Sequence, residues 1–362
     1  MSGPAATGRA PGWPRQAAKI ALALALGTLG GYLADRLALP LAWMIGAMAV
    51  TTVAAVAGLP ITMAMNLRTV MVAVLGIMLG SGFSPEILER LGQWSLSLAA
   101  VGLYAAVAGA ACTFYYRRLC RYDPVTAYFA AMPGGLSEMV LMGSAMGGDM
   151  RIISLTHAAR VLLVVMALPF AFQLLAGYEP GDKPAAGLPL LDMDPGAMAV
   201  LALCGLFGFL GARALRIPAA GLVGPMFLSA VVHLIGWSEA SPPLELVAAA
   251  QVVIGSAIGC RFAGTAPALI GRVVLTAAGG TAILLAVSLA TAFALQALTE
   301  IPGQALVLAF APGGLAEMSL IALALSVDAA FVATHHVIRI FLIVIFAPLA
   351  FRLLRRRRND PD

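Results

Sequence analysis

The stretch Pro133-Gly134-Gly135-Leu136-Ser137-Glu138-Met139 recurs 179 residues later as Pro312-Gly313-Gly314-Leu315-Ala316-Glu317-Met318. In both copies a helix-breaking Pro-Gly-Gly stands inside an apolar run, and a glutamate follows three residues after the second glycine. The copies continue in register downstream, and 16 of the 40 residues in 133–172 are identical to their counterparts. We infer that the chain is an internal duplication and that the polar residues shared by the copies carry its chemistry.

The duplication extends upstream of the glycines, because Gly27-Thr28-Leu29-Gly30 matches Gly205-Leu206-Phe207-Gly208 at almost the same offset. These matches set the expected boundaries of the chain. Residues 1–14 form a disordered N-terminal tail, 15–178 the first membrane repeat, 179–194 an acidic linker outside the cytoplasm, and 195–358 the second membrane repeat.

The composition places the chain among integral membrane proteins. Hydrophobic residues make up 61% and charged residues 11% of the sequence, and the mean hydropathy is +0.95. Much of the net charge of +5 is Arg352 and Arg355–Arg358 at the end of the last apolar run, which is a topology signal and not a nucleic-acid site. The four cysteines have no CxxC spacing, so neither a disulfide framework nor a zinc site is indicated.

Apolar runs between the charged loops predict the membrane segments. The expected spans are 17–35, 40–58, 67–83, 94–114 and 150–177 in the first repeat, and 197–215, 219–237, 246–262, 270–297 and 329–351 in the second. The Pro-Gly-Gly segments, 125–147 and 304–326, either cross the membrane or turn back within it.

Loop charges choose between these two topologies. If both segments cross, Arg213, Arg216, Arg261 and Arg272 face outside, against the positive-inside rule. If both are re-entrant, nearly all basic loops lie inside, and only Arg36, Arg90 and Lys183 violate the rule. We therefore predict an all-α polytopic membrane protein with two inverted-topology repeats, each of about five transmembrane helices plus one re-entrant Pro-Gly-Gly hairpin. It would lie in the bacterial inner membrane with both termini in the cytoplasm.

The glycine breaks are the first candidates for a binding site. Gly134 and Gly135, with Gly313 and Gly314, would end one half-helix and let another restart with its positive end toward the protein centre. A packing kink is the alternative. Glu138 and Glu317 fall in the first turn of the restarted helices. They either neutralise that end or hold a cation or proton.

Two further pairs lie deep in the following helices. Arg160 and Arg339 stand 11 residues after Asp149 and Asp328, about 16 Å along an α-helix. Each arginine either pairs with Glu138 or Glu317 or binds an anionic substrate directly.

A histidine precedes each arginine by three residues, on the same helix face. His157 and His336 are either hydrogen-bonded core residues or proton relays. Asp149 and Asp328 are expected to cap their helices, and the GxxxG pairs, such as Gly76 with Gly80, to pack helices closely.

The doubled Pro-Gly-Gly-Leu-x-Glu-Met motif, followed by Asp, His and Arg, resembles the AbrB duplication family of bacterial integral membrane proteins. The resemblance covers about residues 15–355. It implies a duplicated membrane fold, and the names attached to the family include an ammonia monooxygenase, a regulator of gene expression and a transporter-like protein. A copper monooxygenase needs several converging imidazoles, which four scattered histidines do not provide. A DNA-binding regulator needs a soluble basic module, and none is present in the sequence.

From these residues we expect a secondary active transporter and not an enzyme. A small, anionic organic solute would bind between the two glycine breaks, and Na⁺ or H⁺ would couple its movement, with no other cofactor and no metal site. A non-transporting membrane sensor that affects gene expression indirectly is the alternative, and an amine-related oxidase is third. The expected partners are the solute, the lipid bilayer and, as an open alternative, further copies of the chain. Nucleic acid is not among them.

Overall fold

The computed structural model describes residues 13–85, 87, 91–176 and 187–359, and this part of the chain is helical throughout, without a strand. Residues 1–12 and 179–186 of the predicted tail and linker, together with Arg90 and Lys183, lie outside the described residues. Helix α1 begins at Trp13, within the predicted tail.

The helices follow the same order in both halves. The first half contains α1 (Trp13–Arg36), α2 (Ala42–Val56), α3 (Met65–Gly80), the 3₁₀ turn η1 (Leu91–Trp94), α5 (Ser95–Arg118), α6 (Pro124–Ala131), α7 (Leu136–Ala145) and α8 (Met150–Ala176). The second half contains the 3₁₀ turn η2 (Leu190–Asp192), α9 (Pro195–Ala214), α10 (Ala220–Leu234), α11 (Leu244–Gly259), the 3₁₀ turn η3 (Cys260–Phe262), α12 (Pro267–Leu298), α13 (Gly303–Phe310), α14 (Leu315–Ala324) and α15 (Ala329–Asn359).

Seven segments of the described chain are long and apolar enough to cross a membrane. They are Trp13–Arg36, Gly92–Arg118, Met150–Leu174, Pro195–Ala214, Leu244–Phe262, Pro267–Leu298 and Ala329–Leu353. The chain is therefore an all-α polytopic membrane protein. Three of the ten predicted spans are shorter helices, α2, α3 and α10, with 15, 16 and 15 residues. At ~1.5 Å per residue, each is about 22–24 Å long, less than the ~30 Å of a hydrocarbon core.

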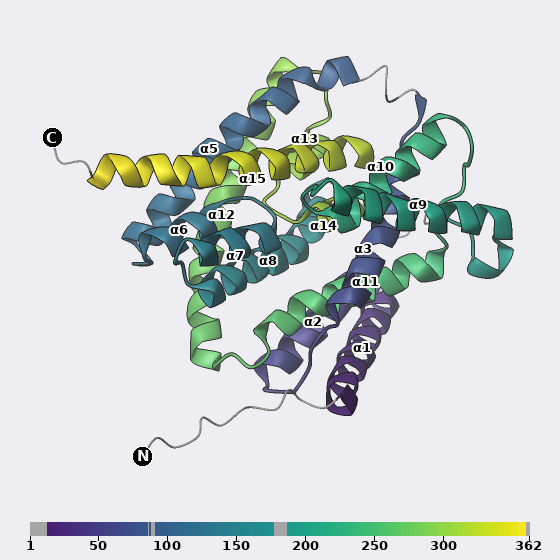
Figure 1. The fold of residues 1–362 in the computed structure, drawn as a ribbon, viewed down its shortest axis with the longest axis horizontal. Coiled ribbons are helices and arrows are strands. Elements are labelled where there is room, and N and C mark those ends of the chain that lie inside the picture. The colour runs from purple at the N-terminus through teal and green to yellow at the C-terminus, as the bar shows by residue number, and fades with distance from the viewer. Residues whose placement is uncertain (1–12, 86, 88–90, 177–186, 360–362) are drawn as a thin grey trace.

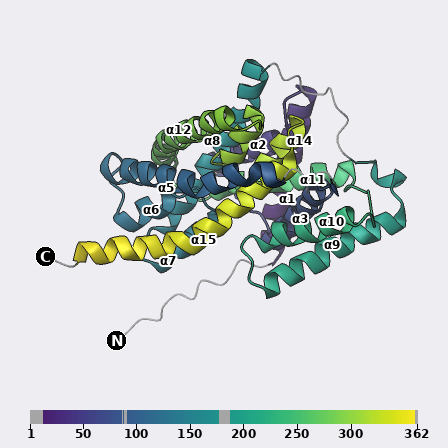
Figure 2. The ribbon, with the colours of Figure 1, turned by 90° about the horizontal axis from the view of Figure 1, so that it is seen from above.

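The helices pack in two groups that do not follow the boundary between the halves. Helices α1, α2 and α3 pack with α9, α10 and α11, and we call this set the frame group. Helices α5 to α8 pack with α12 to α15, and we call this set the hairpin group. In both views, α5, α6, α12 and α15 lie on one side of the molecule and α1, α9, α10 and α11 on the other (Figures 1 and 2). Each group thus takes equivalent helices from both halves.

Glycines bring the helices of the frame group into backbone contact, and they do so reciprocally. A Cβ placed on Gly76 of α3 would lie 2.5 Å from the carbonyl oxygen of Leu222 in α10. A Cβ placed on the equivalent Gly255 of α11 would lie 2.5 Å from the carbonyl oxygen of Met44 in α2. No side chain fits at either crossing, as expected for small-residue packing between membrane helices. This exchange of equivalent contacts is what two copies related by a two-fold axis produce.

Hydrogen bonds join segments that are far apart in the sequence. Tyr122 Oη lies 2.8 Å from Thr276 Oγ1, and Arg151 donates to the carbonyl oxygen of Gly264 at 2.9 Å. In addition, Ser81 Oγ lies 3.0 Å from Ser241 Oγ, and Ser97 Oγ lies 2.9 Å from His335 Nε2.

Candidate functional site

The Pro-Gly-Gly stretches break the chain into pairs of short helices, as the sequence predicted. Helix α6 ends at Ala131 and α7 begins at Leu136, and α13 ends at Phe310 and α14 begins at Leu315. With 8 and 10 residues, the helices of each pair are about 12 and 15 Å long.

The first pair folds back on itself. The backbone N–H of Asp149, just after α7, donates to Thr126 Oγ1 near the start of α6 at 2.8 Å. A Cβ on Gly143, near the end of α7, would lie 3.1 Å from the Cβ of Phe129 in α6. Helices α6 and α7 are therefore antiparallel neighbours with the glycines at their tip.

Arg160 of α8 holds the end of α6. Its Nη1 donates to the carbonyl oxygen of Met132 at 3.0 Å, and its Nη2 donates to His157 Nδ1 at 2.8 Å. His157 Nε2 lies 2.9 Å from the carbonyl oxygen of Phe129, so the ring must donate there and accept at Nδ1. Both side chains are buried, with Arg160 only 3% exposed. We call this arrangement the arginine–histidine clasp.

The second half repeats the clasp on equivalent atoms. Arg339 donates to the carbonyl oxygens of Ala311 at 2.7 Å and Gly313 at 2.9 Å, and to His336 Nδ1 at 2.9 Å. His336 Nε2 in turn lies 3.0 Å from the carbonyl oxygen of Leu308. In the first clasp, Arg160 lies 3.5 Å from the carbonyl oxygen of Gly134, whereas the equivalent hydrogen bond from Arg339 to Gly313 in the second clasp is 2.9 Å long.

The clasp gives the arginines a role that the sequence did not predict, beside the two alternatives of a pair with a glutamate or direct contact with an anionic substrate. A helix that stops inside the protein leaves its last carbonyls without donors, and its C-terminal end carries partial negative charge. A guanidinium has several donors and a permanent positive charge, so it satisfies both needs at once. Arg160 and Arg339 each keep a buried Nε–H that has no partner within the described residues.

The two glutamates lie over the starts of the restarted helices. A Cβ on Gly135 would collide with the carboxylate of Glu138, and a Cβ on Gly314 would collide with that of Glu317. Each carboxylate thus folds back over the first turn of its helix, where a negative charge is favourable. The two positions differ in exposure, because Glu317 is buried at 7% exposure and Glu138 is half-buried.

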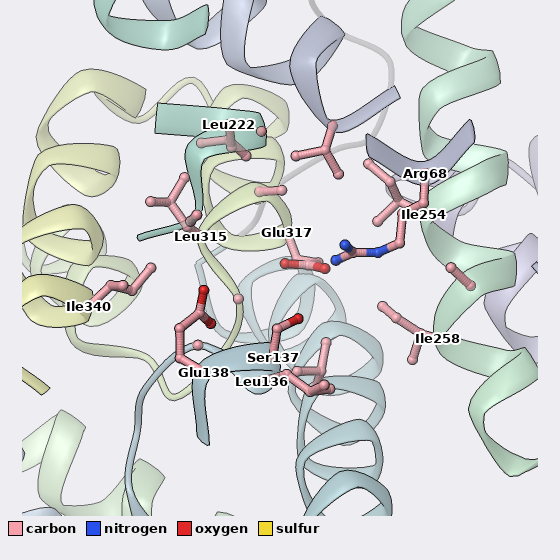
Figure 3. Close-up of a pocket in the computed structure, with 18 of the residues that line it drawn as sticks. Arg68, Leu136, Ser137, Glu138, Leu222, Ile254, Ile258, Leu315, Glu317 and Ile340 are labelled. Atoms are coloured by element: carbon pink, nitrogen blue, oxygen red, sulfur yellow. The ribbon is translucent and has the colours of Figure 1, made fainter. Parts of the chain in front are cut away.

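Both glycine tips border one cavity of about 450 Å³. All the predicted site residues except the two histidines line it: Gly134, Gly135, Glu138, Arg160, Gly313, Gly314, Glu317 and Arg339. Its opposite wall comes from the frame group, including Leu222 of α10 and Ile254 and Ile258 of α11. The volume lies in the range of small-molecule sites, roughly 300–1,000 Å³. The structure therefore gathers residues about 180 positions apart in the sequence around a single space (Figure 3).

Three arginines of the cavity were absent from the predicted site. They are Arg68 in the first turns of α3, Arg213 in the last turn of α9 and Arg261 in η3. Figure 3 shows Arg68 extending toward the carboxylate of Glu317, while Ser137 lies on the side of the first tip. Arg68 and Arg261 are half-buried and Arg213 is exposed. In the sequence these arginines were explained by the positive-inside rule alone, and nothing indicated that they also line a cavity.

The two aspartates that precede α8 and α15 have a simpler role. Asp149 accepts from the backbone N–H groups of Arg151 and Ile152 at 2.8 and 3.0 Å, and Asp328 accepts from Phe331 at 3.0 Å. Both are helix caps, as predicted. Within the described ranges, no three His, Cys, Asp or Glu side chains are grouped so as to hold a metal ion.

Comparison with known proteins finds a family and two similar chains. The family model described as "Transition state regulatory protein AbrB" matches residues 43–355. The chain is 27% identical over 358 residues to "Uncharacterized protein YhjN" of Bacillus subtilis (strain 168), covering 93% of each protein. It is 25% identical over 327 residues to "Putative regulator AbrB" of Escherichia coli (strain K12), covering 90% of this chain and 92% of that protein. No solved structure matches the chain.

Proposed function

The chain belongs to the AbrB family, and from that premise we propose that this polytopic membrane protein is a secondary active transporter of a small organic solute that carries an anionic group. The solute site is the cavity between the two glycine tips. The observation that supports this proposal most strongly is that both tips, one from each half, border the same cavity. Paired discontinuous helices that meet at a polar cavity are typical of carriers built from inverted repeats.

In this proposal the two hairpins are re-entrant segments that enter the bilayer from opposite faces. Non-helical backbone is tolerated at membrane depth only where it is buried in protein or lines a wet cavity. The tips meet this condition, because Pro133 and Pro312 are buried and the glycines line the cavity. The clasps supply donors to the carbonyls that the breaks release.

The charged side chains of the cavity have separate roles in this mechanism. Arg68, Arg213 and Arg261 attract the anionic group of the solute. One of the two glutamates, Glu138 or Glu317, holds the coupling Na⁺ or H⁺, because a carboxylate within the membrane needs a cation or proton to offset its charge, and the other keeps its negative charge. Arg160 and Arg339, which line the cavity from the hairpin side, keep the glycine tips in place.

In this proposal the frame-group wall of the cavity lies toward the cytoplasmic side of the membrane. The three arginines of the frame-group wall are among those that the positive-inside rule assigns to the cytoplasm. Alternating access would then follow from movement of the hairpin group against the frame group, with the cavity at the boundary between them.

Solute uptake into proteoliposomes tests the proposal. Purified protein is reconstituted with an imposed Na⁺ or pH gradient, and radiolabelled carboxylates and amino acids are offered. We expect gradient-dependent accumulation of at least one of them, and loss of that accumulation in Glu317→Gln. Glu239→Gln, at an exposed loop residue outside the cavity, serves as the control.

A membrane sensor is the second candidate, and one finding favours it. A similar chain from Escherichia coli carries the name "Putative regulator AbrB". A sensor would bind a solute in the same cavity without moving it across the bilayer. Binding that persists in vesicles while no gradient produces accumulation would therefore replace the transporter with the sensor.

A further inference from the structure

Both carboxylates of the cavity lie on one wall, whereas arginines lie on both. The hairpin group contributes Glu138 and Glu317 at the glycine tips, together with Arg160 and Arg339, whose guanidinium groups are hydrogen-bonded in the clasps. The frame group contributes three guanidinium groups, Arg68, Arg213 and Arg261. Figure 3 shows the Arg68 and Glu317 side chains extending toward each other across this space.

A ligand with a single charge is poorly matched to this arrangement. An anion drawn to Arg68 would lie close to the carboxylate of Glu317, and a cation drawn to Glu317 would lie close to Arg68. Like charges at short range raise the free energy of binding in a site of low dielectric constant. An anion also cannot bind at the positive N-terminal ends of α7 and α14, because the carboxylates of Glu138 and Glu317 already lie over them.

A ligand that carries both a positive and a negative charge avoids this repulsion between like charges. Its carboxylate would face the three frame-group arginines while its ammonium group faced the glutamates, so that each charge of the ligand would meet groups of opposite charge. The remaining lining is mainly aliphatic, and the side chains concerned are Leu136, Leu222, Ile254, Ile258, Leu315 and Ile340. An apolar body attached to the two charged groups would fill this part of the cavity.

We propose that the ligand of this cavity is a zwitterion with an apolar side chain, that is, an α-amino acid or a close relative. The carboxylate binds on the side of Arg68, Arg213 and Arg261, and the ammonium group binds on the side of Glu138 and Glu317. This assignment rests on the proposed transport site and gives it a substrate class. It replaces the simple anion that the sequence predicted.

Matched sets of three compounds test the charge requirement. Leucine is compared with 4-methylpentanoate, which lacks the amine, and with 3-methylbutylamine, which lacks the carboxylate. Phenylalanine is compared in the same way with 3-phenylpropanoate and 2-phenylethylamine. Binding to the purified full chain is measured by calorimetry and by the shift of its melting temperature. We expect at least one amino acid to bind at least tenfold more tightly than either of its partners. Equal or tighter binding of the acid, or no binding of either amino acid, overturns the proposal.

Two variants locate the charged groups of the ligand. In Arg68→Gln, the ratio of the dissociation constant of the amine to that of the amino acid should fall at least fivefold, because the contact with the carboxylate is lost. In Glu317→Gln, the ratio of the dissociation constant of the acid to that of the amino acid should also fall at least fivefold, because the contact with the ammonium group is lost. Arg216→Gln is the matched control, since Arg216 is exposed, lies three residues after Arg213 and does not line the cavity. A selectivity pattern unchanged in both cavity variants would overturn the assignment.

Transport of the same compounds separates the two proposals. If the amino acid binds as expected but no ion gradient drives its accumulation, the transport proposal fails and the ligand class stands. If the acid accumulates and the amino acid does not, the ligand class fails and transport stands.

Discussion

The arginine–histidine clasp shows how a membrane protein can keep a broken helix at depth. Each clasp uses a neutral histidine as a spacer, because the ring donates to one carbonyl and accepts from the arginine. The guanidinium then reaches the last carbonyls of the interrupted helix. Leaving such groups unpaired in a buried site costs about 1–3 kcal/mol each. The clasp therefore stabilises the glycine tip whatever ligand binds there.

Arg339→Lys should destabilise the protein, because a lysine ammonium cannot donate in parallel to two carbonyls and a histidine. We expect a loss of about 1–3 kcal/mol of unfolding free energy, seen as a lower melting temperature in detergent. Arg160→Lys should show the smaller effect, since its longest contact is 3.5 Å, against 2.9 Å for the equivalent bond of Arg339. Arg352→Lys, at an exposed site on the same helix as Arg339, is the control. Equal melting temperatures for all three variants would contradict a structural role.

The sequence predicted the clasp residues but not what they bind. His157 and Arg160 stood out because charged and imidazole groups are rare in apolar helices. Their partners are backbone carbonyls, which every residue carries, so no side-chain pattern could identify them. Arg68 and Arg261 were missed for another reason. Loop arginines are explained by topology alone, and only the folded chain places them beside the glycine tips.

At the scale of the helices, glycine sets how closely the frame group packs. Gly208 of α9 faces α10, where an added Cβ would lie 2.6 Å from the carbonyl oxygen of Gly224. Gly30 and Gly46 make the equivalent approach between α1 and α2. The GxxxG spacing predicted close packing of this kind, but it could not show which helix lay opposite.

Two alanine substitutions on one helix test this packing. Gly208→Ala should cost about 1–3 kcal/mol, because the new methyl group would overpack a backbone contact. Gly211→Ala should be neutral or slightly stabilising, since Gly211 is exposed and has nothing within 4 Å of an added Cβ, and alanine is favoured over glycine in helices by about 1 kcal/mol. Melting temperatures measured in detergent and in nanodiscs check both. A Gly211 variant less stable than the Gly208 variant would contradict the packing described here.

At the scale of the whole molecule, the two halves are interleaved. The frame and hairpin groups each draw equivalent helices from both repeats. The sequence predicted the repeat and its internal order of elements, because identical residues mark equivalent positions. It could not predict the groups, since these depend on contacts between helices far apart in the chain.

Equivalent positions in the two repeats give a direct test of inverted topology. Leu119 and Leu298 are 179 residues apart, end equivalent helices and are 66% and 71% exposed. In a variant with the native cysteines replaced, Leu119→Cys should react with a membrane-impermeant maleimide only from the cytoplasmic side, and Leu298→Cys only from the outside. Labelling of both from the same side would show that the repeats run parallel and would remove the basis for alternating access.

During synthesis, each interrupted helix leaves the ribosome before the residue that completes it. Arg160 follows Met132 by 28 residues, and Arg339 follows Ala311 by the same interval. Until that arginine has been translated, the carbonyls at the break have no donor in hydrocarbon, where each unpaired group costs several kcal/mol. If the hairpins are re-entrant, as proposed, we expect α6 and α7 to insert stably into the bilayer only together with α8, and α13 and α14 only together with α15. The unit of insertion would then be a group of three helices and not a single span.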